Sequence, residues 1–254
     1  MALAPLITEV GGNSALAHRR PRAPIAIMPA YQAEASVGAL VRELMAAWPL
    51  TGIPRVIVVD DGSTDDTAAA AQDAGAMVVR HAQNGGKGAA LRSGLRRALV
   101  LGADVAVTVD ADGQHPPEEA LRLATLPVSS DTLVLGVRDL AGAGAPRANQ
   151  FSNGFSNVFI SWFSGRRLLD TQCGLRRYPV EKTLALEVRA SGYGFEAEVI
   201  LRAAHAGWDI EQVPVRVIYP PESERVSHFH SVRDPARIVA RVLHTFATAS
   251  RMRK

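Results

Sequence analysis

The sequence contains a single cysteine, Cys173, in 254 residues. One thiol cannot close an internal disulfide, and it cannot supply the several cysteines of a structural zinc site. A chain without disulfides is typical of a reducing compartment. Long apolar runs are also missing: the best candidate, residues 236–249, is interrupted by Arg237, Arg241 and His244, so it is not a transmembrane helix. We therefore expect a cytoplasmic protein, with at most peripheral contact at the inner face of a membrane.

Charged residues are sparse and nearly balanced over the whole chain. They make up 21% of the sequence, and the formal net charge is +3, which gives no indication of a nucleic-acid partner. The basic excess lies at the C-terminal end, where residues 225–254 hold seven Arg or Lys and one acid, Asp234. Such a segment favours anionic lipid or phosphate, or it is simply a solvated helix face.

Short apolar runs alternate with stretches of helical character. We expect strands over 23–28, 55–59, 76–79, 105–109, 132–137 and 210–217, and helices over 36–48, 64–74, 87–101, 149–164 and 195–206. Strands that alternate with helices of this length predict βαβ units, and hence an α/β fold with a mostly parallel sheet. Acidic and polar residues gather where the strands end, which is the edge of such a sheet that binds ligands.

The sharpest motif is Asp110-Ala111-Asp112 followed by Gln114. Two carboxylates one residue apart at a strand end can face one divalent ion, and carboxylate and amide oxygens suit Mg²⁺ or Mn²⁺. Such an ion would stabilise the charge on a departing diphosphate. The alternative interpretation is an ordinary Asp-Gly turn after a strand.

Two further segments lie at predicted strand ends. Asp60 and Asp61 begin an acidic turn in which Ser63 or Thr64 could cap the next helix. The two carboxylates are not needed for that cap, and they could accept hydrogen bonds from a nucleotide base or ribose. The glycine-rich segment 84–88 precedes the helix that Lys87 opens, but it matches neither the P-loop pattern nor the dinucleotide fingerprint.

These motifs resemble those of a known family. The segments 27–34 (Ile-Met-Pro-Ala-Tyr-Gln-Ala-Glu), 58–67, 84–88 and 109–115 occur in the order and spacing of family 2 glycosyltransferases with the GT-A fold. The segment Asp-Thr-Gln-Cys-Gly-Leu-Arg at 170–176 and the segment Gly-Tyr-Gly-Phe-Glu at 192–196 are most similar to the polyprenyl-phosphate (dolichyl-phosphate) mannose and glucose synthases.

The resemblance implies a site and a cofactor. Asp110, Asp112 and Gln114 would hold Mg²⁺ or Mn²⁺. The residues that would bind the nucleotide sugar are Pro29, Ala30, Tyr31, Glu34, Asp60, Asp61, Lys87, Asp110, Ala111 and Arg225. Where the family commonly has Asn-Glu after the tyrosine, this chain has Gln32 and Ala33. Glu34 would replace the missing acid, and the donor nucleotide stays open between GDP and UDP.

The implied reaction is an inverting displacement that moves a hexose, mannose or glucose, from the nucleotide to a polyprenyl phosphate or a similar lipid. An acceptor phosphate is already anionic near neutral pH, so it needs cationic clamps, for which Arg138 and Arg147 are candidates. An acceptor hydroxyl on a glycan, glycolipid or small molecule would instead need a carboxylate base, with Glu196 as first choice and Asp170 as second. An inactive nucleotide-binding protein is a third possibility, suggested by the altered pair after Tyr31.

The aromatic stripe within residues 149–164 has two interpretations. Its members are Phe151, Phe155, Phe159, Trp162 and Phe163. Aromatic residues at helical spacing usually pack in a core, which is the interpretation favoured here. Alternatively the stripe lies in a lipid interface, with Arg166 and Arg167 beside it.

The chain divides by sequence into three parts. We expect a loose leader over residues 1–22, which lacks the apolar core of a signal peptide. The resemblance implies a GT-A glycosyltransferase domain over 23–234. A basic amphipathic helix is expected over 235–254, with an apolar stripe formed by Ile238, Val239, Val242, Leu243 and Phe246.

Overall fold

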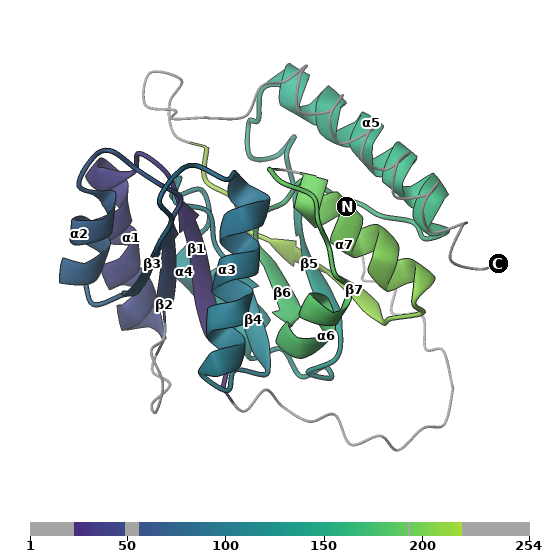
Figure 1. Cartoon of the computed structure of the whole chain (residues 1–254). Coiled ribbons are helices and arrows are strands. Elements are labelled where there is room, and N and C mark those ends of the chain that lie inside the picture. The colour runs from purple at the N-terminus through teal and green to yellow at the C-terminus, as the bar shows by residue number, and fades with distance from the viewer. Residues whose placement is uncertain (1–22, 49–55, 193, 220–254) are drawn as a thin grey trace.

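The structure is a computed structural model, and it describes residues 23–48, 56–192 and 194–219 (Figure 1). The predicted leader, Arg225 and the predicted C-terminal helix lie outside the described residues. The predictions made for those parts therefore stay predictions. Among the described helices, none is both long enough and apolar enough to cross a membrane.

A seven-stranded sheet organises the described residues, in the order β3-β2-β1-β4-β6-β5-β7. The strands are β1 (Ile25–Ala30), β2 (Val56–Asp60), β3 (Met77–Arg80), β4 (Val105–Thr108), β5 (Leu133–Arg138), β6 (Arg176–Pro179) and β7 (Ile210–Val215). Only β6 runs antiparallel to its neighbours. The prediction of a mostly parallel sheet in an α/β fold is confirmed.

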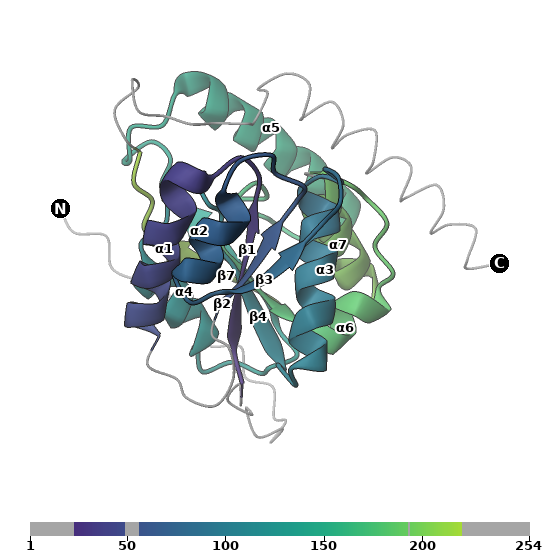
Figure 2. The same cartoon turned by 60° about the vertical axis from the view of Figure 1, so that its left-hand side comes forward.

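Helices cover both faces of the sheet (Figures 1 and 2). They are α1 (Glu34–Ala47), α2 (Thr67–Asp73), α3 (Lys87–Val100), α4 (Pro117–Ala124), α5 (Arg147–Ser164), α6 (Val180–Ala185) and α7 (Gly194–His205). Alternate residues of β1 belong to two cores, because successive side chains of a strand point to opposite faces. Ile25 and Ile27 pack with α3, α6 and α7, whereas Ala26 and Met28 pack with α1, α2 and α4.

The predicted strands and helices within the described residues are all present, with ends displaced by at most three residues. The sequence did not reveal α4, α6 or β6. Strand β6 has the sequence Arg-Arg-Tyr-Pro, yet Arg176 and Arg177 are fully buried. Their guanidinium groups donate to backbone carbonyls, among them those of Cys173, Thr171 and Ser129. Burial of a charge normally requires such compensation, and no hydropathy pattern announces it.

The antiparallel direction of β6 decides where α5 lies. Strand β5 ends at Arg138 at the carboxyl edge of the sheet, and β6 begins at Arg176 at that same edge. The intervening chain, which includes α5, therefore begins and ends at the carboxyl edge. The end of α5 lies beside the start of β7, where Arg166 donates to the carbonyl of Trp208. Figures 1 and 2 show α5 along the outside of the molecule.

The favoured interpretation of the aromatic stripe, that it packs in the core, is wrong for most of its length. Phe151, Phe155 and Trp162 are 79%, 51% and 78% exposed. Only Phe159 and Phe163 pack against a core cluster. The reason is that α5 turns small polar residues toward the protein, where they hydrogen-bond to the segment that precedes β6.

Candidate active site

The loop after β4 brings a cation and two carboxylates together at the carboxyl edge. Lys87 opens α3, and its Nζ lies 2.7 Å from Asp110 Oδ1 and 3.3 Å from Glu196 Oε1. Burial acts to raise the pKa of Asp110, but the surrounding positive groups, the Lys87 ammonium first among them, together hold that pKa below its ordinary value. Three residues distant in sequence, from the starts of α3 and α7 and the end of β4, thus meet in one cluster.

Asp112 lies in the same loop but faces a different environment. Partial desolvation by the surrounding protein is the main cause that raises the pKa of Asp112 to about 6, and the negative charge of Asp110 is the second. Solvent still reaches the Asp112 side chain. Its Oδ1 accepts one hydrogen bond from the backbone N–H of Gln114, at 3.0 Å. Two carboxylates that repel each other in this way are a donor set that suits a divalent cation.

The segment before β6 closes tightly over this loop. A Cβ placed on Gly174 would lie 2.0 Å from Asp110 Oδ2. The Gly174 carbonyl accepts a hydrogen bond of 2.6 Å from Thr108 Oγ1 at the end of β4. Any larger side chain at position 174 would displace the Asp110 carboxylate, so glycine is required by close approach rather than by backbone angle.

Asp60 and Asp61, predicted to bind the nucleotide, both have partners within the protein. Asp60 Oδ1 accepts from the N–H of Ser63, and Asp60 Oδ2 lies 3.2 Å from Arg80 Nε. Asp61 accepts from the N–H groups of Gly85 and Gly86 and lies 2.6 Å from His81 Nδ1. Asp61 thereby fixes the glycine-rich loop that leads into α3.

The loop after β1 is joined to the loop after β2. Gln32 has φ +51°, and its Oε1 accepts from the N–H of Thr64. Ser63 and Thr64 were expected to cap α2, but that helix begins at Thr67 and its N-cap residue makes no side-chain cap. The Ser63 hydroxyl instead accepts from the N–H of Gln32, so the unusual glutamine orders this loop.

The other residues predicted around the nucleotide lie on the same edge. Pro29 and Ala30 end β1, Tyr31 follows with 40% of its surface exposed, and Ala111 separates the two aspartates of the β4 loop. Glu34, the proposed substitute acid, is exposed and accepts from the N–H of Asp66 through Oε2.

The two arginines predicted to bind the acceptor, Arg138 and Arg147, differ in whether they form an ion pair among the described residues. Arg138 donates from Nε and from a terminal nitrogen to the two oxygens of Asp170, at 2.8 and 3.1 Å. This buried pair raises the pKa of Arg138 further, despite the opposing effect of burial. Arg147, at the first turn of α5, is exposed and has no ion-pair partner among the described residues.

The sequence singled out neither Tyr219 nor the contacts of His115. Tyr219 is half-buried, and burial raises the pKa of its hydroxyl, on which the charges of Arg138 and Asp170 also act. His115 is buried, and its Nδ1 and Nε2 face the Arg216 carbonyl and the Cys173 sulfur. A local stretch of sequence could not have shown these contacts. They join residues far apart in the chain, because Tyr219 and Arg216 follow β7 and Cys173 precedes β6.

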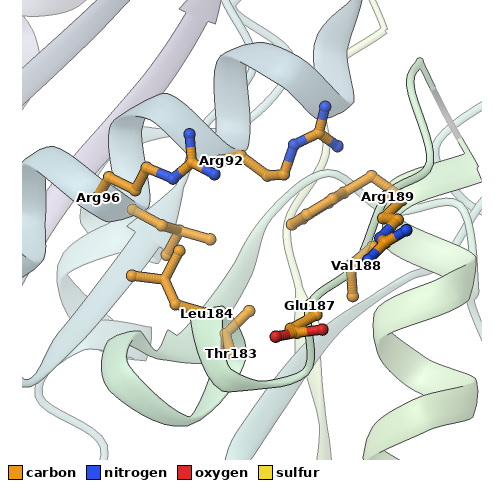
Figure 3. A pocket seen from close by; sticks show the side chains of 9 residues that line it. Arg92, Arg96, Thr183, Leu184, Glu187, Val188 and Arg189 are labelled. Atoms are coloured by element: carbon orange, nitrogen blue, oxygen red, sulfur yellow. The ribbon is translucent and has the colours of Figure 1, made fainter.

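A separate pocket of about 610 Å³ lies between α3 and the segment from α6 to α7. Figure 3 shows Arg92, Arg96, Arg189 and Glu187 around it. None of the predicted site residues lines this pocket. The candidate site is therefore the open carboxyl edge.

Residues 25–180 match the family described as glycosyl transferase family 2. The chain is a family 2 glycosyltransferase. The match begins with β1 and ends just after β6, so it contains the loops that form the candidate site, apart from Glu196 and the segment after β7.

The relatives of this glycosyltransferase include proteins with named activities. The chain is 30% identical over 205 residues to the undecaprenyl-phosphate mannosyltransferase of Micrococcus luteus, a match that covers 76% of this chain and 83% of that protein. It is 29% identical over 221 residues to the UDP-N-acetylglucosamine–dolichyl-phosphate N-acetylglucosaminyltransferase of Methanococcus voltae, covering 76% of this chain and 84% of that one. The resemblance to polyprenyl-phosphate sugar transferases is confirmed at the level of the family.

The fold is shared with solved glycosyltransferase structures. The chain superposes with a TM-score of 0.67 on the crystal structure of glucosyl-3-phosphoglycerate synthase from Mycobacterium tuberculosis in complex with Mn²⁺, UDP and phosphoglyceric acid. The sequence identity is 22%, and the match covers 89% of this chain and 78% of that chain. The predicted GT-A fold is confirmed.

Proposed function

We propose that this glycosyltransferase moves a hexose, mannose or glucose, from a GDP- or UDP-sugar to a polyprenyl phosphate, with inversion at the anomeric carbon. The observation that carries this proposal is the joint presence, at one sheet edge, of the Asp110–Asp112 loop, Lys87 and Arg147, which has no ion-pair partner in the part of the chain that the structure describes. Relatives named for transfer to undecaprenyl phosphate and dolichyl phosphate support the class of acceptor.

The donor would bind over the start of α3. Asp110 and Glu196 hold the Lys87 ammonium at that helix N-terminus, where backbone N–H groups and the helix dipole favour a diphosphate. Asp61 keeps the preceding glycine-rich loop in place. Tyr31, Pro29 and Ala30 would line the nucleoside, together with Glu34, Asp60, Ala111 and, outside the described residues, Arg225.

Asp112 and Gln114, with Asp110 beside them, are the residues that would hold Mg²⁺ or Mn²⁺. The described residues contain no cluster of three or more His, Cys, Asp or Glu side chains that could hold a metal ion, so the donor's own phosphates would complete the ligand set. The bound ion would neutralise charge on the departing diphosphate. Neighbours crystallised with Mn²⁺ or Mg²⁺ and UDP support this cofactor class.

The acceptor needs orientation more than it needs a base. In the proposed step an oxygen of the acceptor phosphate forms the new bond to the anomeric carbon, and the bond from that carbon to the donor diphosphate breaks, with its electron pair leaving on the diphosphate. No proton must be removed, because the phosphate oxygen is already anionic. We therefore assign Glu196 to the positioning of Lys87, to which its buried carboxylate lies close.

Arg147 is the better candidate for the clamp on the acceptor phosphate. Its guanidinium is exposed and has no ion-pair partner among the described residues, whereas Arg138 already donates to both oxygens of Asp170. In this assignment Arg138 is a positioning residue, which holds the segment that carries Gly174 close to Asp110. Arg147 is the arginine that binds the substrate.

The test is transfer of label from a radiolabelled nucleotide sugar. GDP-mannose, GDP-glucose, UDP-glucose and their relatives are each offered with undecaprenyl phosphate, and in parallel with hydroxyl acceptors such as glycans and glycolipids. Label that enters the organic phase only with the polyprenyl phosphate supports the proposal. Transfer to hydroxyl acceptors alone would move the function to the alternative acceptor class, and no transfer to any acceptor would favour an inactive nucleotide-binding protein.

A further inference from the structure

The apolar side of helix α5 faces outward, whereas an ordinary surface helix turns its apolar side toward the protein. Its outward side presents Phe151, Phe155, Val158 and Trp162, at spacings of four, three and four residues, and all four are more than half exposed. Leu169, in the loop that follows, is also half exposed. Surface helices normally turn such residues inward, and contiguous exposed apolar patches mark interaction surfaces.

The inward side of α5 is the polar one. Ser152, Asn153 and Ser156 are buried. Ser156 Oγ lies 3.0 Å from Thr171 Oγ1, and Asn157 Oδ1 accepts from the N–H of Thr171 at 2.7 Å. These hydrogen bonds fix the rotation of the helix about its axis. The apolar stripe is consequently held outward by specific contacts and cannot roll inward without breaking them.

The charged residues on α5 and directly at its two ends are of one sign. Helix α5 contains no Asp or Glu. Arg147 is exposed at its first residue, and Arg166 and Arg167 are exposed just after its last. An apolar stripe with a tryptophan and arginines at both ends suits the interface of a bilayer that contains anionic lipid.

We infer that the outward side of α5 is a membrane-contacting surface, which lies flat in the interface of a bilayer containing anionic phospholipid. This inference rests on the proposed function, because a polyprenyl phosphate resides in a membrane. The chain that carries α5 leaves β5 and enters β6 at the carboxyl edge of the sheet, so a membrane on the first turns of this helix is next to the site, and Arg147 is shared by the two.

A bilayer fits this stripe better than the chain's own C-terminal segment does. Residues 225–254 carry seven basic residues and one acid, so the arginines at the ends of α5 would repel them rather than attract them. A second copy of the chain would bring the same arginines face to face. Anionic headgroups provide the opposite charge.

The experiment is flotation of the full chain with vesicles of phosphatidylcholine alone and of phosphatidylcholine with phosphatidylglycerol. The wild type should float with the anionic vesicles, and more weakly at high salt. Phe151→Ser with Trp162→Ser should weaken the vesicle affinity by about tenfold or more, given the apolar area withdrawn from the interface. Arg167→Gln should reduce the salt-sensitive part of binding.

The matched control is Val100→Ser, which removes an equally exposed apolar side chain at the end of α3; its flotation should equal the wild type. Quenching of tryptophan fluorescence by brominated lipid gives a second measurement, because Trp162 is the exposed tryptophan among the described ones, while Trp48 and Trp208 are buried. Trp162→Phe should float normally and lose most of the quenching.

Three results would overturn the inference. The first is equal flotation of the wild type and the double serine variant, and the second is absence of flotation of the wild type. The third is a wild-type dimer in light scattering that the double variant converts to monomer without any change in vesicle binding. Transfer to a short-chain, water-soluble polyprenyl phosphate keeps the two proposals apart: the double variant should retain it, whereas loss of that transfer in the wild type itself would count against the proposed function and not against the membrane surface.

Discussion

At the residue scale, the sequence identified the motif residues but not how they are distributed between tasks. Asp110 pairs with Lys87, while Asp112 keeps its carboxylate toward solvent with a single backbone hydrogen bond. The two aspartates of one short motif therefore differ in what they can offer a ligand. Asp61, predicted to bind the nucleotide, also orders the loop before α3. Such divisions depend on partners that are distant in sequence.

Replacement of Asp112 by alanine should lower turnover by about 100-fold or more, since it removes the carboxylate best placed to help neutralise the leaving diphosphate. The fold should be unaffected, because its one hydrogen bond lies within an exposed loop. Turnover and the melting temperature are the measurements. Asp131→Ala, at an exposed aspartate 3.7 Å from Lys182, is the control and should match the wild type. Undiminished turnover in the Asp112 variant would remove the metal assignment.

Gly174→Ala should cost about 100-fold in turnover, because a methyl group 2.0 Å from Asp110 Oδ2 must displace that carboxylate. Gly154→Ala is the matched control, as its Cβ would meet nothing within 4 Å. That control should retain activity and gain up to about 1 kcal/mol of helix stability. If both alanine variants were equally active, the close approach would have no importance for the site.

Cys173 should be chemically silent in the folded enzyme. Burial, and next the Asp170 carboxylate, raise the pKa of its thiol to about 12, so the thiol stays protonated throughout the pH range in which the enzyme would be assayed. At pH 8 we expect no reaction with an aromatic disulfide reagent in buffer and one equivalent of reaction in urea. A full equivalent in buffer would show that this thiol is accessible in the native state.

At the scale of elements, apolar periodicity predicted the helices and strands of the core layers. It did not predict β6 or the orientation of α5. Strands β1, β2 and β4 are apolar along their length and were easy to recognise. Strand β6 is two arginines, a tyrosine and a proline, and its burial depends on carbonyls contributed by three other segments. In α5 the spacing of the aromatics correctly predicted a helix, but periodicity cannot say which side faces the protein.

The Arg138–Asp170 pair belongs to this scale, since it ties the end of β5 to the segment before β6. Arg138→Ala leaves a fully buried carboxylate without its cation, and we expect it to lower the free energy of unfolding by about 3–5 kcal/mol. Urea unfolding measures this, and Asp170→Asn added to the same variant should restore part of the loss. Arg147→Ala is the variant with which Arg138→Ala is compared.

Arg147→Ala should leave the free energy of unfolding unchanged, because Arg147 is exposed and has no ion-pair partner among the described residues. It should raise the KM for polyprenyl phosphate by about tenfold, as expected when a charge-assisted contact to phosphate is lost. A normal acceptor KM in the Arg147 variant, or normal stability in the Arg138 variant, would contradict the roles assigned to the two arginines.

At the scale of the whole molecule, the two functions proposed here share the carboxyl edge of one sheet. The parallel strands bring their terminal loops to that edge, and the single antiparallel strand of the sheet, β6, returns the chain that carries α5 to it. A water-soluble donor would enter over α3, and a lipid acceptor would arrive along α5. The sequence offered candidate residues for both the donor and the acceptor, whereas which side of α5 faces outward became visible only in the structure.

The most direct test of this account is titration calorimetry of GDP and UDP into the wild type and into the Asp112→Ala variant, each with and without Mn²⁺. The account predicts that at least one nucleotide binds the wild type much more tightly with Mn²⁺ present, and that the variant loses this difference while it still binds weakly through the Lys87 edge. Equal binding by the wild type with and without the ion, or an undiminished effect of Mn²⁺ in the variant, would contradict it.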